Sequence, residues 1–228
     1  MKYVQKGGEP PSFTTWKALA TEDWIPTYSN LRGREKADLQ DSLLADQGYI
    51  CCYCGTQINQ ENSHIEHLPS QSSFVDLADA INYQHLLASC GISEQWRKDK
   101  YEKEWTEKKF EELTSSSDRC GIKRGNQPVA ISPLQADCEA FFAYDASNGA
   151  IRAKENFDRS EAAPATIALL NLDTQKLRDL RKAAIDSAIL EVLTVEPTEE
   201  ELVKLFKEKN QRGEFIPFCS AIDYIIKI

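Results

Sequence analysis

The chain has 228 residues, of which 41% are hydrophobic and 28% are charged, a composition that is ordinary for a globular protein. These proportions exclude a disordered tail, a collagen-like fibre and a small disulfide scaffold. Lysine and arginine number 27 against 36 acidic residues, so the formal net charge is -9. Sequence-tolerant nucleic-acid binders are usually basic. A chain of this charge would need a local basic patch or a basic partner to act on nucleic acid.

Two absences bear on location. No apolar run approaches the roughly 20 residues that a membrane helix needs, and residues 1–11 lack the apolar core of a signal peptide. We therefore expect a cytoplasmic protein without a membrane partner.

The first 50 residues predict an arm followed by a helix. Residues 1–35 carry prolines and glycines among aromatic residues, which is typical of an extended arm that packs on the body. Leucines at helical spacing within residues 34–47 predict a short helix. Gly48 follows at the position where glycine commonly ends a helix.

The next segment predicts short strands and one charged helix. Residues 49–55 run through aromatic and β-branched side chains into Cys-x-x-Cys-Gly, which indicates a strand entering a tight metal-binding turn. Residues 64–67 alternate in polarity and predict a short strand, and residues 74–90 carry an apolar stretch. Residues 93–113 predict an exposed helix with Ser93 as its N-cap.

The last hundred residues predict small strands and then helices. Residues 128–160, including the Ile131–Leu134 segment, are expected to form strand pieces, with a turn at Ser147–Gly149. From residue 161 onward the pattern is helical, with Asp173 as a possible cap and a Thr-x-x-Glu capping box at 198–201. The side chains predicted to face inward after Asp173 are Leu177, Leu180, Ala184, Ile185, Ala188 and Ile189.

Seven cysteines in a chain without an export signal point to metal binding or burial rather than to a disulfide framework. Four of them form two pairs, with each of the last two directly before a glycine: Cys51, Cys54, Cys90 and Cys120. Such a set predicts a structural zinc site with four thiolates, although 29 residues separate the last two and a redox-active Cys-x-x-Cys or simple burial remain alternatives. Cys52 is expected to point away from the metal, and Cys138 and Cys219 are expected to be buried thiols.

All three histidines fall between the cysteine pairs. His64, His67 and His85 lie within 22 residues, together with Glu66. A pocket of imidazole and carboxylate can hold a divalent metal and leave one imidazole free as a base. Two alternatives stay open: a second zinc site made by His64, Glu66 and His85, and histidines that have no functional role.

These motifs resemble a known family. The order Cys-x-x-Cys, Glu66-His67, Leu-Leu before a cysteine, and Cys-Gly followed by Lys-Arg resembles the HNH endonucleases. The longer pattern CCYCGTQINQENSHIEHLPSQS…LLASCG…CGIKRGN…ISPL resembles the PtuB family of Septu anti-phage systems, which also occurs beside retrons. The opening MKYVQKGGEPPSFTTWK and the segment IALLNLDTQKLRDLRKAAI are similar to that family as well.

The resemblance implies an α+β fold with a ββα-metal core, stapled by a four-cysteine zinc site and surrounded by helices. It implies an arm at 1–35, a nuclease core at 36–135 with the inserted helix 93–113, and a mostly helical region at 136–228 packing on the core. The implied activity is metal-dependent hydrolysis of phosphodiester bonds in DNA or RNA. The implied partner is an ABC-type, PtuA-like ATPase in a hetero-oligomer. The chain contains no P-loop motif, so any ATP use would belong to that partner.

Roles follow position by position from the resemblance. His67 would be the general base and Glu66 would ligate a catalytic Mg²⁺ or Mn²⁺, which would stabilise charge on the phosphate. His85 would orient the site. His64 shares a strand face with Glu66 and would be a second metal ligand or a phosphate contact.

The chain departs from the family after the fourth cysteine. Many members carry Asn or His there, where this chain has Gly121. Asn126 is the candidate substitute ligand, and Lys123 and Arg124 would face nucleic-acid phosphates. The departure leaves two other functions open: a non-catalytic zinc module that docks on and regulates a partner, and a redox protein that uses Cys51 and Cys54.

Overall fold

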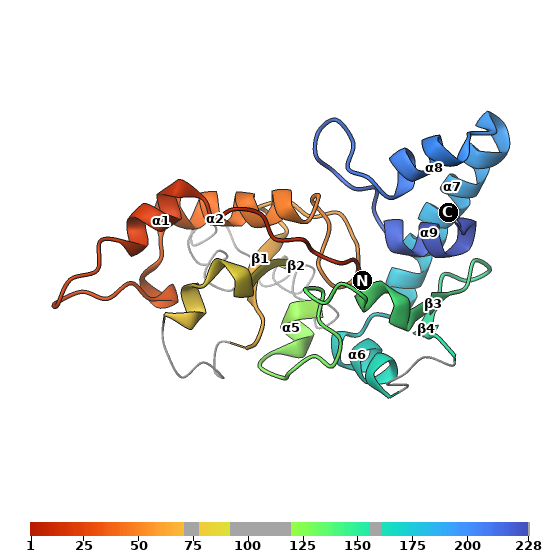
Figure 1. The fold of residues 1–228 in the computed structure, drawn as a ribbon. Coiled ribbons are helices and arrows are strands. Elements are labelled where there is room, and N and C mark those ends of the chain that lie inside the picture. The colour runs from red at the N-terminus through yellow and green to blue at the C-terminus, as the bar shows by residue number, and fades with distance from the viewer. Residues whose placement is uncertain (71–77, 92–119, 156–160, 228) are drawn as a thin grey trace, which may run out of the picture.

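A computed structural model describes residues 1–70, 78–91, 120–155 and 161–227. Within these ranges the chain is mixed α and β, with two small antiparallel sheets among helices (Figure 1). The predicted helix 93–113 with its Ser93 cap lies outside the described residues. The helices are α1 (Pro11–Lys17), α2 (Gly33–Asp46), α5 (Cys120–Arg124), α6 (Ala162–Leu170), α7 (Gln175–Val195), α8 (Glu199–Phe206) and α9 (Cys219–Ile226). The strands are β1 (Ser63–His67), β2 (Leu86–Cys90), β3 (Phe142–Tyr144) and β4 (Ile151–Ala153).

The N-terminal arm is not extended throughout. Its residues 11–17 form α1, because Pro11 suits the first helical position and Phe13 and Trp16 share one buried face. The rings of these two residues stack with centroids 5.6 Å apart. The predicted helix that follows is confirmed as α2, and Gly48 after it has a φ of +58°, as expected for a residue that ends a helix.

The β1–β2 hairpin lies beside the end of α2 (Figure 1). It pairs Ser63 with Cys90 at one end and His67 with Leu86 at the other. Gln47, buried just after α2, fastens the hairpin to the turn that follows the helix. Its amide donates to the carbonyl oxygens of Ile50 (2.9 Å) and Ala88 (2.8 Å) and accepts from the Ala88 N–H (2.6 Å). Helix α5 then packs against β2.

Two predicted strands did not form. Residues 49–55 make a tight turn, in which Ile50 forms an isolated bridge with Gln57. The 131–134 segment also turns instead of pairing. The predicted turn between the later strands is confirmed: Gly149 has a φ of +69°, and a side chain there would strike the backbone of α7.

The caps and buried faces of the C-terminal helices differ in detail from those that the sequence predicts. Thr174 caps α7 in place of Asp173, since its hydroxyl accepts from the Leu177 N–H at 3.3 Å. Asp173 instead pairs with Arg178 and accepts from the Ile151 N–H at 3.0 Å. The capping box of Thr198 and Glu201 on α8 is confirmed. Leu180, predicted to face inward, is 45% exposed.

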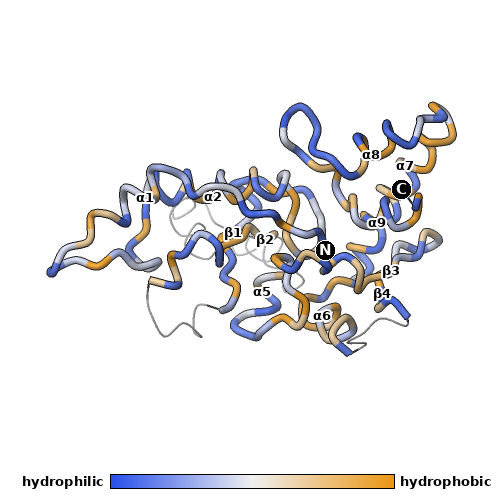
Figure 2. The backbone as a smooth tube through the Cα atoms, in the orientation of Figure 1, coloured by the Kyte–Doolittle hydropathy of each residue, from blue (hydrophilic) through white to orange (hydrophobic). Residues whose placement is uncertain are grey.

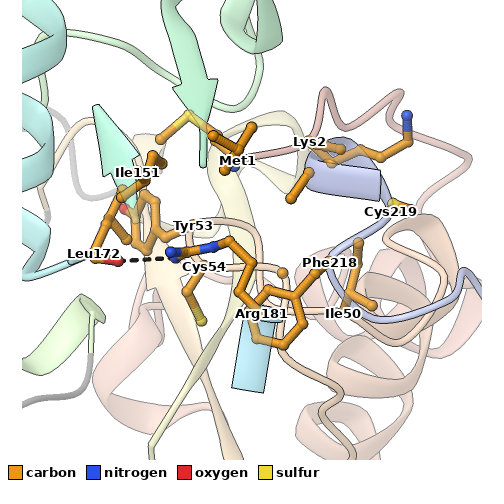
Figure 3. Close-up of a pocket in the computed structure, with 14 residues that line it drawn as sticks. Met1, Lys2, Ile50, Tyr53, Cys54, Ile151, Leu172, Arg181, Phe218 and Cys219 are labelled. Carbon is orange, nitrogen blue, oxygen red and sulfur yellow. Dashed lines mark hydrogen bonds between the residues drawn. The ribbon is translucent and has the colours of Figure 1, made fainter. Parts of the chain in front are cut away.

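Arg181 takes an inner position on α7 and is 1% exposed. Its guanidinium donates to the carbonyl oxygens of Gly149 and, at 2.9 Å, Leu172, and it lies 5.7 Å from the Tyr144 and Phe218 ring centroids. Figure 3 shows Arg181 and its hydrogen bond to Leu172. One guanidinium therefore holds α7 to the β3–β4 turn and to the end of α6. Figure 2 shows apolar residues along β2 and α6. None of the described helices combines the length and apolar character that crossing a membrane would require.

Candidate functional site

Three separate segments bring four thiols together. Cys51 and Cys54 lie in the turn after α2, Cys90 ends β2, and Cys120 begins α5. All four are buried, and their Sγ atoms lie within 4.8 Å of one another, so the predicted set forms a group that could hold a metal ion. The Sγ atoms of Cys54 and Cys90 are 3.8 Å apart. This matches the edge of about 3.8 Å expected for a tetrahedron with Zn–S bonds of about 2.3 Å.

The local backbone prepares the turn for metal binding. The Cys51 N–H donates to Thr56 O at 2.8 Å, and the Gly55 N–H returns to Cys51 O at 3.1 Å. Gly55 has a φ of +78°, which a glycine adopts without strain. The Cys90 N–H points at the Cys51 Sγ at 3.3 Å, as an amide does when it stabilises a thiolate.

Because the four thiols lie close together, their pKa values shift in opposite directions. Burial raises the pKa of Cys51, but hydrogen bonds from Cys120 and the neighbouring thiols outweigh it and hold the pKa well below its ordinary value. Contacts with Cys51 and the other thiols, together with burial, push the pKa of Cys120 well above its ordinary value. Four thiolates therefore share this space only with a cation among them.

The remaining cysteines stand apart from this group. Cys52 is buried and is not a member of it. Cys138 and Cys219 are buried single thiols, as predicted. Burial raises the pKa of Cys138 to about 12 and that of Cys219 to about 11, so both are protonated and unreactive at neutral pH.

A buried charged cluster lies beside the four-thiol group. His64 and Glu66 project from the same face of β1, as strand alternation requires. The His64 Nδ1 lies 2.9 Å from Gly91 O, and its Nε2 lies 3.1 Å from Glu66 Oε2. Burial lowers the pKa of His64, but the hydrogen bond and charge of Glu66 outweigh burial and raise the pKa above 6.5.

The other carboxylate oxygen of Glu66, Oε1, forms an ion pair with Arg124. The Arg124 Nη1 lies 2.5 Å from Glu66 Oε1, which also accepts from the Tyr53 hydroxyl at 3.1 Å. Both terminal nitrogens of Arg124 donate to His67 O at 3.0 Å, and its Nε donates to Gln127 O at 3.2 Å.

The prediction that Arg124 faces nucleic-acid phosphates is therefore wrong. Its side chain is 2% exposed, because Glu66 needs a counter-charge in the interior. Lys123, its neighbour on α5, is exposed.

The surroundings of residue 121 explain why this chain has glycine where many of the endonucleases that it resembles carry Asn or His. A Cβ on this residue would lie 2.7 Å from His64 Nε2 and closer still to Glu66 Oε2. A side chain at residue 121 would therefore point at Glu66 and His64, which leave no room for it. Asn126, the candidate substitute ligand, is instead exposed in the turn after α5.

His67 lies on the opposite face of β1 from Glu66. Its Nε2 is 3.1 Å from Ala80 O, and its ring meets the Tyr28 ring edge-on with centroids 4.4 Å apart. A carbonyl oxygen can only accept, so Nε2 carries the proton and Nδ1 keeps its lone pair. Burial lowers the pKa of His67 from 6.5 to about 4, so the ring is neutral at pH 7.

His85 lies at the same end of the hairpin as His67. It precedes β2, its Nδ1 is 3.4 Å from Asp79 O, and its backbone oxygen accepts from the Leu68 N–H at 2.8 Å. The register places His64 opposite Ser89, well away from His85. A zinc site made by His64, Glu66 and His85 is therefore wrong, and within the described ranges only the four cysteines form a group of three or more such ligands.

The residues do not fit a catalytic Mg²⁺ or Mn²⁺ at Glu66. Both carboxylate oxygens are engaged, one by a guanidinium and one by an imidazole. A dication beside Oε1 would meet the positive charge of Arg124 at close range in the interior.

The sequence did not single out two tyrosines that contact the candidate site residues. Tyr53, inside the cysteine turn, contacts Glu66, and Tyr28, from the N-terminal arm, packs on His67. The one signal for Arg124 is its place four residues after Cys120, one helical turn along α5. The chain matches no protein-family model and no curated protein.

The four-thiol group predicts one tightly held metal ion per chain. Cys54→Ala should lose at least half of this metal and destabilise the fold by roughly 3 kcal/mol or more, since metal binding contributes directly to folding. The matched variant Cys219→Ala removes a buried thiol outside the group. Elemental analysis of both purified variants would contradict the assignment if they held equal metal.

Burial of His67 predicts acid sensitivity with a defined sign. Between pH 6.5 and 4 the unfolded chain binds a proton at His67 that the folded chain does not, so the free energy of unfolding falls as the pH drops through this window. The contribution amounts to about 3 kcal/mol. Urea unfolding of wild type and His67→Gln from pH 7 to 4 should give a shallower dependence for the variant; parallel curves would refute the buried neutral histidine.

Proposed function

We propose that this chain is an HNH-type endonuclease in which a zinc-bound cysteine group holds a β hairpin and a short helix together. The observation that carries the proposal is His67, a neutral imidazole fixed by Ala80 O at the end of β1. A general base must be unprotonated at working pH and held in one orientation, and His67 meets both conditions. The resemblance of the Glu66-His67 motif and the four cysteines to HNH endonucleases supports the same activity.

The chemistry requires two proton transfers and one exchange of bonds at phosphorus. The Nδ1 of His67 takes a proton from water as the water oxygen bonds to phosphorus. The bond from phosphorus to the leaving oxygen then breaks, and that oxygen takes a proton from solvent. Lys123, exposed at the end of α5, is a cation available to contact phosphate.

The proposal includes an ABC-type ATPase as partner in an anti-phage complex in the cytoplasm. A net charge of -9 disfavours binding of this chain alone to nucleic acid. A basic partner would supply the positive charge that this binding needs. The C-terminal end of α7 exposes Leu190, Leu193 and Val195 (62%, 71% and 66%), an apolar surface suited to docking. The described residues include all seven cysteines, and their lack of disulfide bonds agrees with a reducing compartment.

A second candidate is a zinc module that docks on and regulates its partner without catalysis. The ion pair between Arg124 and Glu66 favours this second function. Glu66 is the residue that the resemblance assigns to the catalytic metal, and Arg124 neutralises its charge. In that case His67 contributes only to packing.

A cleavage assay separates the two candidates. Supercoiled plasmid and total RNA would be incubated with the zinc-loaded chain, alone and with a PtuA-like ABC-type ATPase, for wild type and His67→Gln. We expect the variant to lose about 10²–10⁴-fold in rate, the usual effect of removing a general base, at unchanged zinc content. Gln84→Ala, an exposed change next to His85, is the matched control and should cut like wild type.

Two results would count against the nuclease. Cleavage by His67→Gln at the wild-type rate would show that His67 is not the base. Formation of a stable complex with the ATPase but no cleavage of either substrate by wild type would favour the regulatory module.

A further inference from the structure

We infer that the Arg124 guanidinium permanently occupies the place of the divalent cation at Glu66, so that this site binds no Mg²⁺ or Mn²⁺. The inference deepens the proposed function and rests on it only for its consequence for catalysis: cleavage at His67 would proceed without a metal held by Glu66. The claim about metal binding itself concerns the folded chain alone.

The charge of Glu66 is already balanced by the protein. Glu66 is the buried anion of the cluster, and the Arg124 Nη1 meets its Oε1 at 2.5 Å. The His64 Nε2 meets Oε2 at 3.1 Å. The carboxylate thus has a full counter-charge from the protein, and an added dication would be repelled by the guanidinium across a short distance in a medium of low dielectric.

Backbone carbonyl groups also hold Arg124 in place. Besides Glu66, its guanidinium donates twice to His67 O and once to Gln127 O. Swinging it away would leave these carbonyl groups and the charge itself without partners in a buried site. Arg124 is therefore a fixed part of the interior and not a surface side chain that yields to a metal.

The space around the Glu66 carboxylate is also restricted. The position from which a third ligand would approach is Gly121, and even a Cβ there would collide with His64 and Glu66. Asn126, the alternative donor, is exposed beyond α5. Glycine at 121 and arginine at 124 are thus complementary: the first leaves the carboxylate uncrowded, and the second neutralises it.

The test measures metal binding without substrate. Zinc-loaded wild type and Arg124→Met would be titrated with Mn²⁺, and bound Mn²⁺ read by the loss of the free-ion electron paramagnetic resonance signal. We expect no specific Mn²⁺ binding by wild type and a single new site in Arg124→Met, with affinity at least about tenfold higher than wild type. The double variant Arg124→Met/Glu66→Gln should lose that site again.

Each result bears on the inference directly. A wild-type Mn²⁺ site that Glu66→Gln abolishes would overturn it, and so would absence of binding to both wild type and a zinc-loaded, folded Arg124→Met. If Arg124→Met does not fold, Arg124→Gln replaces it, and the comparison of wild type with Glu66→Gln still decides whether Glu66 holds a cation. Because no substrate is present, failure of the nuclease proposal in the cleavage assay leaves this result unchanged.

Discussion

The arrangement of the candidate site depends on the meeting of four thiols. They come from the turn after α2, the end of β2 and the start of α5, which are far apart in the sequence. Helix α5 has five residues and could not persist alone, because helices this short are unstable in water. Cys120 fixes its first residue in the four-thiol group, and one turn later Arg124 reaches Glu66. A metal ion held by these four thiols would therefore fix both the hairpin and the charged side chain of Arg124 beside it.

The two faces of β1 carry different chemistry. One face holds Glu66 between Arg124 and His64 in a closed set of charged contacts. The other face holds His67, whose neutrality comes from burial and whose orientation comes from Ala80 O. A single strand thus separates a structural ion pair from a candidate base. The acidic residue of the Glu66-His67 motif is thus tied up in an ion pair, while the histidine beside it is neutral and held in one orientation.

Much of this could be predicted from sequence because the signals are local. Cys-x-x-Cys with two Cys-Gly pairs identified the four-thiol group, and alternation identified the shared face of His64 and Glu66. What could not be predicted depends on packing at a distance. The partner of Arg124 is 58 residues away, and a Lys-Arg pair after a cysteine suggests a solvent-facing cation just as readily as a buried one. The α1 helix escaped prediction because its prolines indicate extended chain until Phe13 and Trp16 are known to be buried together.

The central claim is that four cysteine sulfurs bind one zinc ion that joins these segments. X-ray absorption at the zinc K-edge of the purified chain measures it most directly. We expect a single shell of four sulfur atoms at about 2.3 Å from zinc. A shell with nitrogen or oxygen in place of one or more sulfurs, or cysteine pairs joined as disulfides with no bound zinc, would contradict it.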